Sequence, residues 1–182
     1  LTASAVQAGL LDDSGVQGGL AVVIGCGDTK LITELGQNER FLVQSLDTDP
    51  AKVEQAREAI RSGNNYGRVS VAVFDGRKLP YADNLVNLIV AEGPAGITQK
   101  EMDRVLAPHG VLLEKQGGGW KKTVKPWPGE IDQWTHWLHD ASGNAVAKDS
   151  RVGPPRHVQW IARPLWQRHH DMMATIPAMV SA

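Results

Sequence analysis

Apolar runs and amphipathic segments alternate along residues 1–115 of the chain. The run Leu20–Ile24 is continuously apolar, as expected for a strand that is covered on both faces of a sheet. Further strands are predicted over residues 41–47, 69–74, 85–91 and 110–115, and helices over residues 2–11, 29–36, 49–62 and 98–106. This alternation predicts an α/β fold with a doubly wound parallel sheet and right-handed crossovers.

Two of the predicted helices carry N-terminal signals. Asp49 is a good N-cap, and Pro50 takes the first helical position, where its missing N–H costs nothing. The sequence TQKE at residues 98–101 is a capping box, in which Thr98 and Glu101 satisfy each other's backbone N–H groups. Both helices therefore begin where the hydrophobic pattern places them.

The composition changes after the run GGG at residues 117–119. All six tryptophans and five of the six histidines follow this run, and the patterns there are short and broken by proline and glycine. We therefore place a domain boundary between residues 117 and 130. The prediction is an α/β domain over residues 1–119 and an irregular, Trp-rich tail over residues 120–182.

The totals exclude several classes of protein. The formal net charge of −1 gives the 182-residue chain no electrostatic reason to bind nucleic acid or an anionic membrane. Its one cysteine, Cys26, excludes a disulfide framework within the chain and any multi-cysteine metal site. No apolar run reaches the roughly 18 residues that a membrane span needs. The chain begins without Met, in what reads as the middle of a protein, so we expect a fragment of a longer one.

Candidate chemistry begins with the loop GCGDTK, which follows the first strand. Gly25 and Gly27 lack a Cβ, so their backbone can lie against a ligand at the carboxyl edge of the sheet. Asp47 follows 22 residues after Gly25, at the end of the second strand, where a carboxylate can accept hydrogen bonds from both ribose hydroxyls. Asp75 ends the third strand on the same edge, where it can accept from the exocyclic amine of an adenine. Together these residues predict a nucleoside-containing cofactor.

Four segments in order resemble the motifs of class I S-adenosylmethionine-dependent methyltransferases: VVIGCGDTKL, LDTDP, FDGRKLPYADNLVNLIVAEG and EMDRVLAPHGVLLE. The resemblance covers about residues 1–115 and implies a C-terminally shortened Rossmann-like fold of that type, with S-adenosylmethionine as cofactor and no metal. The cofactor-binding residues that it implies are Gly25, Cys26, Gly27, Asp47, Thr48, Phe74, Asp75 and Gly76. The glycine loop would lie against the methionine part, and Phe74–Gly76 would flank the adenine. Glu92 would face the methyl group and the substrate, as general base or substrate anchor, and is the predicted catalytic residue.

The chain also departs from this family pattern. Val23 stands where methyltransferases usually carry an acid that organises the loop and the cofactor ammonium group, and Thr29 stands at the usual third glycine. Asn87 replaces the acid that is common in the fourth strand. Two hypotheses therefore remain: a methyltransferase of an unidentified small molecule, or an inactive methyltransferase-like module that serves as a scaffold. A nicotinamide dehydrogenase fits less well, because Lys30 stands at the third glycine of its fingerprint.

The tail contains clusters of aromatic and histidine residues. IDQWTHWLHD, residues 131–140, predicts one short helix with a packing face made of Trp134, Trp137 and Leu138. His136 and His139, spaced i, i+3, could bind a metal, but the favoured interpretation is that aromatic residues anchor an extended segment to a neighbouring surface. The same holds for the histidine pair with an aspartate at residues 169–171.

Residues 143–171 resemble the segment that opens a pyrroloquinoline-quinone-type β-propeller in large bacterial multidomain proteins, where a methyltransferase-like domain precedes the propeller. The resemblance implies a truncated propeller entry, with exposed apolar surface that could support a homodimer. Propellers of that type are often exported, whereas S-adenosylmethionine is made and kept in the cytoplasm. An active enzyme would therefore be cytoplasmic, and an exported parent protein would favour the scaffold.

Overall fold

The computed structural model describes residues 3–63, 66–93 and 96–151. It divides the chain into two units, Leu1–Pro126 and Trp127–Ala182. The first unit contains every helix and strand of the described residues, and the second is described over residues 127–151. Each unit is treated by itself below.

The first unit is built on one six-stranded sheet with the order β3-β2-β1-β4-β5-β6. Its strands are β1 (Gly19–Ile24), β2 (Phe41–Asp47), β3 (Val69–Val73), β4 (Val86–Ala91), β5 (Leu106–Gln116) and β6 (Gly119–Val124). The first five are parallel, and β6 pairs antiparallel with β5. The strand order reverses between β1 and β4, which is where such sheets leave a crevice at their carboxyl edge. The predicted doubly wound, Rossmann-like fold is confirmed.

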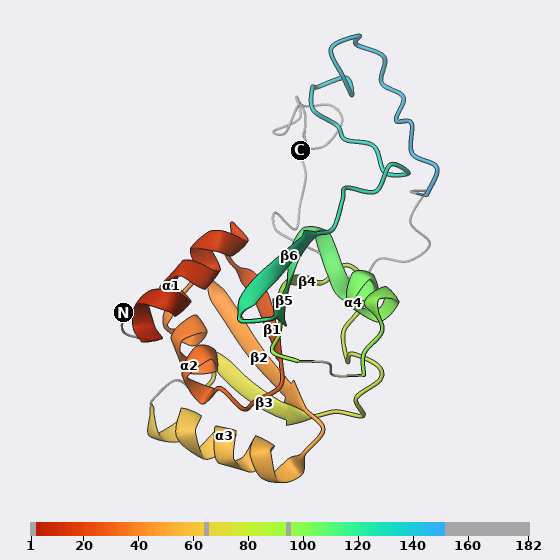
Figure 1. Cartoon of the computed structure of the whole chain (residues 1–182). Helices are drawn as coiled ribbons and strands as arrows, with labels where there is room; N and C mark the ends of the chain where they lie inside the picture. The colour runs from red at the N-terminus through yellow and green to blue at the C-terminus, as the bar shows by residue number, and fades with distance from the viewer. Residues whose placement is uncertain (1–2, 64–65, 94–95, 152–182) are drawn as a thin grey trace, which may run out of the picture. The chain divides into compact units, whose positions relative to one another are not determined.

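Helices cover both faces of this sheet. α1 (Ala3–Ser14), α2 (Thr29–Gln37) and α3 (Pro50–Ser62) lie on one side, and α4 (Gln99–Val105) lies on the other (Figure 1). Two hydrophobic clusters follow from the alternation of side chains along the strands: Val23 belongs to the cluster under α2 and α3, and Val22 and Ile24 to the cluster under α4. Burial on both faces explains why β1 is apolar at every position from Leu20 to Ile24.

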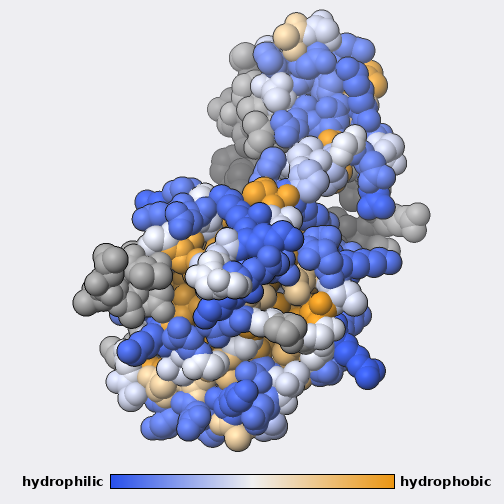
Figure 2. All heavy atoms as spheres, in the orientation of Figure 1, coloured by the Kyte–Doolittle hydropathy of each residue, from blue (hydrophilic) through white to orange (hydrophobic). Residues whose placement is uncertain are grey.

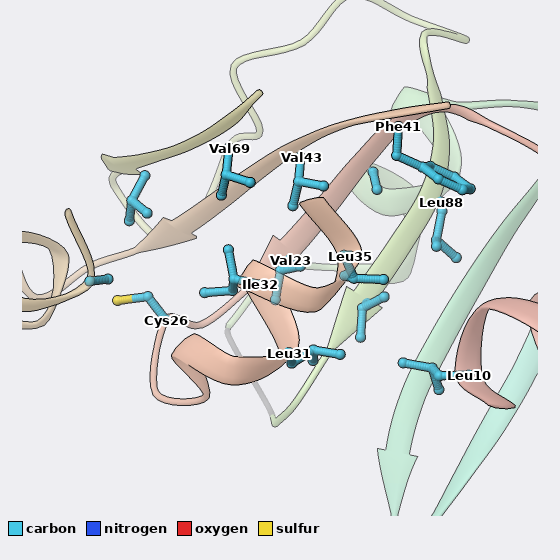
Figure 3. Close-up of a cluster of buried hydrophobic side chains, with 14 of the residues drawn as sticks. Leu10, Val23, Cys26, Leu31, Ile32, Leu35, Phe41, Val43, Val69 and Leu88 are labelled. Atoms are coloured by element: carbon cyan, nitrogen blue, oxygen red, sulfur yellow. The ribbon is translucent and has the colours of Figure 1, made fainter. Parts of the chain in front are cut away.

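Helix α2 fixes the strand ends closest to the glycine loop. Leu31, Ile32 and Leu35 are buried and point toward the side chains of the strands, Val23 and Val43 among them (Figure 3). A Cβ added to Gly36 would overlap the side chain of Val69, so glycine allows the helix to approach β3. The loop before α2 is therefore attached to a helix that cannot shift without disrupting the core.

The predicted helix starts are present. Asp49 caps α3 by accepting a hydrogen bond from the Ala51 N–H at 2.9 Å, and Pro50 is its first residue. Thr98 caps α4 through a 3.3 Å bond from the Glu101 N–H. Strand β5 begins at Leu106, earlier than predicted, because the chain passes from α4 directly into the extended conformation at that residue.

The run GGG is a hairpin turn within the first unit. Gly117 and Gly118 have φ values of +55° and +94°, and β6 follows at once and pairs with β5. Trp120 on β6 is partly buried against the cluster under α2 and α3. The division between units falls after Pro126, inside the predicted range of residues 117–130, and the first unit therefore extends past residue 119 to include β6.

The second unit has no helix or strand in its described residues, 127–151, so the helix predicted over residues 131–140 is wrong. The backbone N–H groups of Thr135 and His136 both donate to the carbonyl of His139, at 2.9 and 3.1 Å, and His139 has a φ of +69°. This closes a tight turn instead of a helix. Trp137 and Leu138, predicted to pack, are 67% and 47% exposed.

No group of metal-ligating side chains is present in the described part of the chain, so the turn does not bring His136 and His139 into a metal site. His139 instead lies within 2.6 Å of Asp132 Oδ2, and Trp134 meets its ring edge-on at 5.3 Å between centroids. The histidine pair at residues 169–170, Asp171 and most of the predicted propeller entry lie outside the described residues.

The surface of the first unit is mainly polar. Figure 2 shows one face, on which polar residues dominate and apolar atoms are visible in small areas between them. The exposed large apolar residues of this unit lie on separate elements and connections: Leu42, Tyr66, Val73, Leu85 and Val124. Such scattered exposure is ordinary for a folded domain. None of the helices among the described residues is long and apolar enough to cross a membrane.

Candidate active site

A cleft of about 320 Å³ opens at the carboxyl edge of the sheet. Residues that follow or end four neighbouring strands line it: Gly25 and Gly27 after β1, Asp47 and Thr48 at β2, Phe74 after β3, and Glu92 and Gly93 after β4. The cleft therefore lies across the point where the strand order reverses. The structure brings together six of the predicted site residues there.

The glycine loop is shaped to leave its backbone facing this cleft. Gly25 has a φ of +99°, which residues with a side chain rarely adopt. Its N–H donates to the Leu46 carbonyl at 2.8 Å, and its own carbonyl accepts from Ser45 Oγ at 3.0 Å. A Cβ on Gly27 would meet no atom within 4 Å, so the loop is open at that residue.

The start of α2 is already capped by an acid. Asp28 Oδ1 accepts hydrogen bonds from the N–H groups of Lys30 and Leu31, both at 3.1 Å. A dinucleotide cofactor binds its pyrophosphate at the corresponding helix start, through free N–H groups and the positive end of the helix dipole. Asp28 occupies two of these donors and brings a negative charge, which disfavours a phosphate ligand at this position.

Asp47 is held in place by three donors. Its Oδ1 accepts from the Asp49 N–H at 2.9 Å, and its Oδ2 accepts from the N–H and the Sγ of Cys26 at 3.1 and 3.3 Å. Burial raises the pKa of Asp47, but these hydrogen bonds outweigh burial and hold the pKa below its usual value. Oδ1 accepts from the Asp49 N–H and a carboxylate oxygen has two lone pairs, so an ionised Asp47 can still accept a hydroxyl from a ligand.

Cys26 contributes from behind the cleft. It is 3% exposed and belongs to the cluster under α2 and α3, where Figure 3 shows it beyond Ile32. Burial, and then the hydrogen bond to Asp47, raise the pKa of its thiol to about 12, so the thiol is neutral and unreactive. The side chain does not line the cleft, and Cys26 acts on the site through Asp47.

The residues after β3 divide into two groups. Phe74 lines the cleft, and its N–H donates to the Asp47 carbonyl at 3.1 Å. Asp75 and Gly76 are not among the lining residues, although Gly76 lies against Thr48. The exposed Asp75 accepts through Oδ1 from the N–H groups of residues 77 and 78, at 2.8 and 2.9 Å. Asp75 therefore lies on the predicted edge of the sheet, and its role toward an adenine amine stays a prediction.

Glu92 reaches over the glycine loop from the neighbouring strand β4. Its N–H donates to the Ile24 carbonyl at 3.5 Å, and its Oε2 is 3.7 Å from the point where a Cβ on Gly25 would lie. Burial, and then the negative charge of Asp28, raise the pKa of this half-buried carboxylate, and Lys115 and a hydrogen bond from the Asp28 backbone oppose the shift only in part. Glu92 is therefore a carboxylate without a sufficient positive charge beside it.

A second cleft, of about 490 Å³, lies beside the first at the ends of β4 and β5. Gly93 lines both clefts. The second combines the apolar side chains of Ile97 and Met102 with Glu114 and Lys115. Two ligands, one bound in each cleft, would therefore meet beside Gly93.

The structure also explains two of the departures from the family pattern. Val23 is fully buried in the cluster under α2 and α3, where an acid would lose its hydration without gaining a partner. Asn87 accepts a hydrogen bond from the Leu20 N–H at 3.0 Å and so joins β4 to the start of β1.

Lys52, in the first turn of α3, lines the cleft and was not among the predicted residues. The signal that could have identified Lys52 is its place in the first turn of the helix that follows Asp47.

A parallel sheet whose glycine loop and second-strand acid meet at the strand-order reversal defines a domain that binds a nucleoside-containing cofactor. The chain belongs to the methyltransferase-domain family, whose model matches residues 22–113. The ubiquinone/menaquinone biosynthesis C-methyltransferase UbiE of Neisseria meningitidis serogroup A is 40% identical to it over 86 residues. That segment is 44% of this chain and 34% of the relative, so the chain matches about a third of the length of such curated proteins.

Solved structures agree on the fold. Geranyl diphosphate C-methyltransferase from Streptomyces coelicolor, in complex with S-adenosyl-L-homocysteine, matches 60% of this chain and 45% of its own with a TM-score of 0.53 and 18% identity. The cyclase SpnF matches 64% of this chain and 47% of its own with a TM-score of 0.55 and 20% identity. At these identities the likeness shows the architecture alone, and SpnF is named as a cyclase.

Proposed function

We propose that the first unit binds S-adenosylmethionine and transfers its methyl group to a small-molecule acceptor. The observation that carries this proposal is the meeting of Gly25, Asp47 and Glu92 in one cleft at the strand-order reversal. Membership of the methyltransferase-domain family supports it, as does the 40% identity with a C-methyltransferase of quinone biosynthesis. The acceptor is a small molecule in this proposal, because the second cleft beside the first has a volume of only about 490 Å³.

The residues of the cleft fit this cofactor. Asp47 would accept a ribose hydroxyl, since its carboxylate is ionised and keeps an unused lone pair on Oδ1. Phe74 would lie beside the adenine, and the open backbone at Gly27 would face the amino-acid part. Asp75 uses Oδ1 in its turn and does not line the cleft, so its role toward the adenine amine is the least direct of the set.

The cofactor supplies a methyl group on a sulfonium, which is already a good leaving group for an in-line displacement. The chain must therefore align the acceptor with the methyl group and exclude water. Gly93 lines both clefts, so it stands where the two ligands would meet. Glu92, the residue before it, is the predicted catalytic residue, either as a general base or as an anchor.

Titration calorimetry of the full chain with S-adenosylmethionine and S-adenosylhomocysteine tests the proposal. We expect saturable heat with both ligands and a rise in melting temperature, because a ligand that binds only the folded state stabilises it. ATP and NADH serve as controls and should give neither signal, since Asp28 caps the helix start that a phosphate would need. No heat and no thermal shift with either S-adenosyl ligand at millimolar concentration would refute the proposal.

The alternative is an inactive module that serves as a scaffold beside a β-propeller. Val23 favours it, because the buried position lacks the acid that the family usually carries there. The propeller entry after residue 143, dimerisation through the Trp-rich tail and the cellular compartment are parts of the same alternative. A protein that binds neither S-adenosyl ligand but dimerises in sedimentation experiments only when residues 127–182 are present would support it.

A further inference from the structure

One carboxylate is missing from the glycine loop and another lies close to it. Val23, two residues before Gly25, stands at the position of the usual ammonium-organising acid, and its side chain points away from the cleft into the core. Glu92 follows the adjacent strand β4 and reaches the same loop from the cleft side. We propose that Glu92 binds the ammonium group of the cofactor's amino-acid part in place of the acid that is absent at residue 23.

The geometry supports this inference, which rests on the proposed function. Glu92 Oε2 is 3.7 Å from the point that a Cβ on Gly25 would occupy, so the carboxylate faces the loop backbone at its first glycine. The Glu92 N–H donates to the Ile24 carbonyl, which fixes the strand end beneath the side chain. The side chain lines the first cleft and not the second. It is therefore placed for the cofactor, and binding of the ammonium group replaces the role as general base or acceptor anchor that the sequence predicts for Glu92.

The order of residues along the sheet edge gives the cleft a direction. Phe74, Asp47, Gly25 and Glu92 follow β3, β2, β1 and β4, which is the order of the strands in the sheet. Strands lie about 4.8 Å apart, so the ends of β2 and β4 are separated by about 10 Å. A ligand with its ribose at Asp47 and its aromatic ring at Phe74 extends its remaining part toward Glu92. In an S-adenosyl amino acid that part carries the ammonium group.

The charged residues around Glu92 do not fully compensate its negative charge. Asp28 lies near it and adds a second negative charge, whereas Lys115 compensates only in part. The other charged residues of the first cleft are Asp47 and Lys52. A cation bound beside Glu92 would remove the repulsion from Asp28, and charge-assisted hydrogen bonds in a half-buried site are among the stronger ones. A neutral or anionic group there would not offset the repulsion between Glu92 and Asp28.

The experiment compares two ligands by titration calorimetry on the full chain. S-adenosylhomocysteine carries the ammonium group, and 5′-methylthioadenosine keeps the adenosine and the sulfur but lacks the amino-acid part. The variants are Glu92→Gln, which keeps the shape and removes the charge, and Glu58→Gln, a matched control on the exposed side of α3. No acceptor is present, so an effect cannot come from acceptor binding.

We expect Glu92→Gln to weaken S-adenosylhomocysteine binding by about 10- to 100-fold, the loss of one charge-assisted hydrogen bond. Binding of 5′-methylthioadenosine should be unchanged, and Glu58→Gln should leave both affinities as in the wild type. Equal losses for the two ligands, or no loss for S-adenosylhomocysteine, would overturn the inference while the proposed function stands. A wild type that binds neither ligand would overturn both. Circular dichroism establishes that each variant is folded.

Discussion

Asp47 and Glu92 lie in the same cleft, at the ends of β2 and β4, yet their surroundings are opposite in kind. Two backbone N–H groups and a thiol donate to Asp47, and they hold its pKa below the usual value despite burial. Burial and the charge of Asp28 raise the pKa of Glu92. One carboxylate is stabilised as an anion before any ligand arrives, and the other is not.

The difference indicates two kinds of ligand group. Asp47 needs nothing from a ligand to remain ionised, so it suits neutral hydroxyl donors that add to an existing set of hydrogen bonds. Burial and the charge of Asp28 oppose the ionisation of Glu92, and a positive charge beside it would favour the anion, so it suits a cation. A cofactor with hydroxyls at one end and an ammonium group at the other satisfies both carboxylates, and the predictions below test each of them.

The largest effect is expected at the β2 end of the cleft. Asp47→Ala should weaken binding of S-adenosylmethionine by about 10- to 100-fold in titration calorimetry, because it removes a ribose contact that contributes about 1.5–3 kcal/mol as a charge-assisted hydrogen bond. Asp47→Glu, which keeps the charge but lengthens the side chain, is the companion variant. Binding that is equally strong in Asp47→Ala and in wild type would place the ribose elsewhere.

The stability of the ligand-free protein should respond in opposite directions to the two neutral isosteres. Asp47→Asn should lower the melting temperature, by about 2–4 °C for each kcal/mol lost, because its one amide oxygen can accept from either Asp49 or Cys26 and its NH₂ group then faces the other donor. Glu92→Gln should raise the melting temperature, because it removes a carboxylate whose ionisation is opposed by burial and by Asp28. Differential scanning calorimetry without ligand measures both shifts.

The pH dependence of these shifts follows from the directions of the two pKa changes. A lowered pKa at Asp47 stabilises the fold above the ordinary aspartate value of about 3.9, and the stabilisation disappears as pH falls through the folded pKa. A raised pKa at Glu92 destabilises the fold as pH rises from about 4.3 through the folded pKa. Both differences from wild type should therefore be larger at pH 7 than near pH 3. A Glu92→Gln protein that melts below wild type at pH 7 would contradict the comparison.

Much of the first unit could be predicted from the sequence, because its elements are determined by local patterns. The strand predicted at residues 41–47 is β2, and the helix predicted after Asp49 is α3. The run GGG was interpreted as a domain boundary, but positive φ at Gly117 and Gly118 serves a hairpin whose partner strand is set by tertiary pairing. The turn at His139 replaced a predicted helix for the same reason, since its backbone bonds and its contact with Asp132 are not visible as a pattern.

The candidate site shows the same limit. Gly25 and Asp47 could be identified because strand ends of a parallel sheet meet at one edge. The approach of Glu92 to Gly25, by contrast, depends on the pairing of β1 with β4, which joins segments about 65 residues apart in the chain. The cap that Asp28 places on α2 and the bond from Cys26 to Asp47 depend on side-chain conformations that no spacing specifies.

The smallest expected effect tests how Asp47 is held. Cys26→Ala removes the thiol donor but keeps the backbone N–H that also donates to Asp47 Oδ2, so S-adenosylmethionine affinity should fall by no more than about threefold, as a thiol is a weak donor. Cys26→Ser, whose hydroxyl is a stronger donor, should restore it. In the wild type, burial and a pKa raised to about 12 should leave Cys26 unlabelled by iodoacetamide at pH 8 until the protein unfolds. Rapid labelling of the folded protein would show that the thiol is not held behind Asp47. The ionised Asp47 would then be stabilised only by the backbone N–H groups of Cys26 and Asp49.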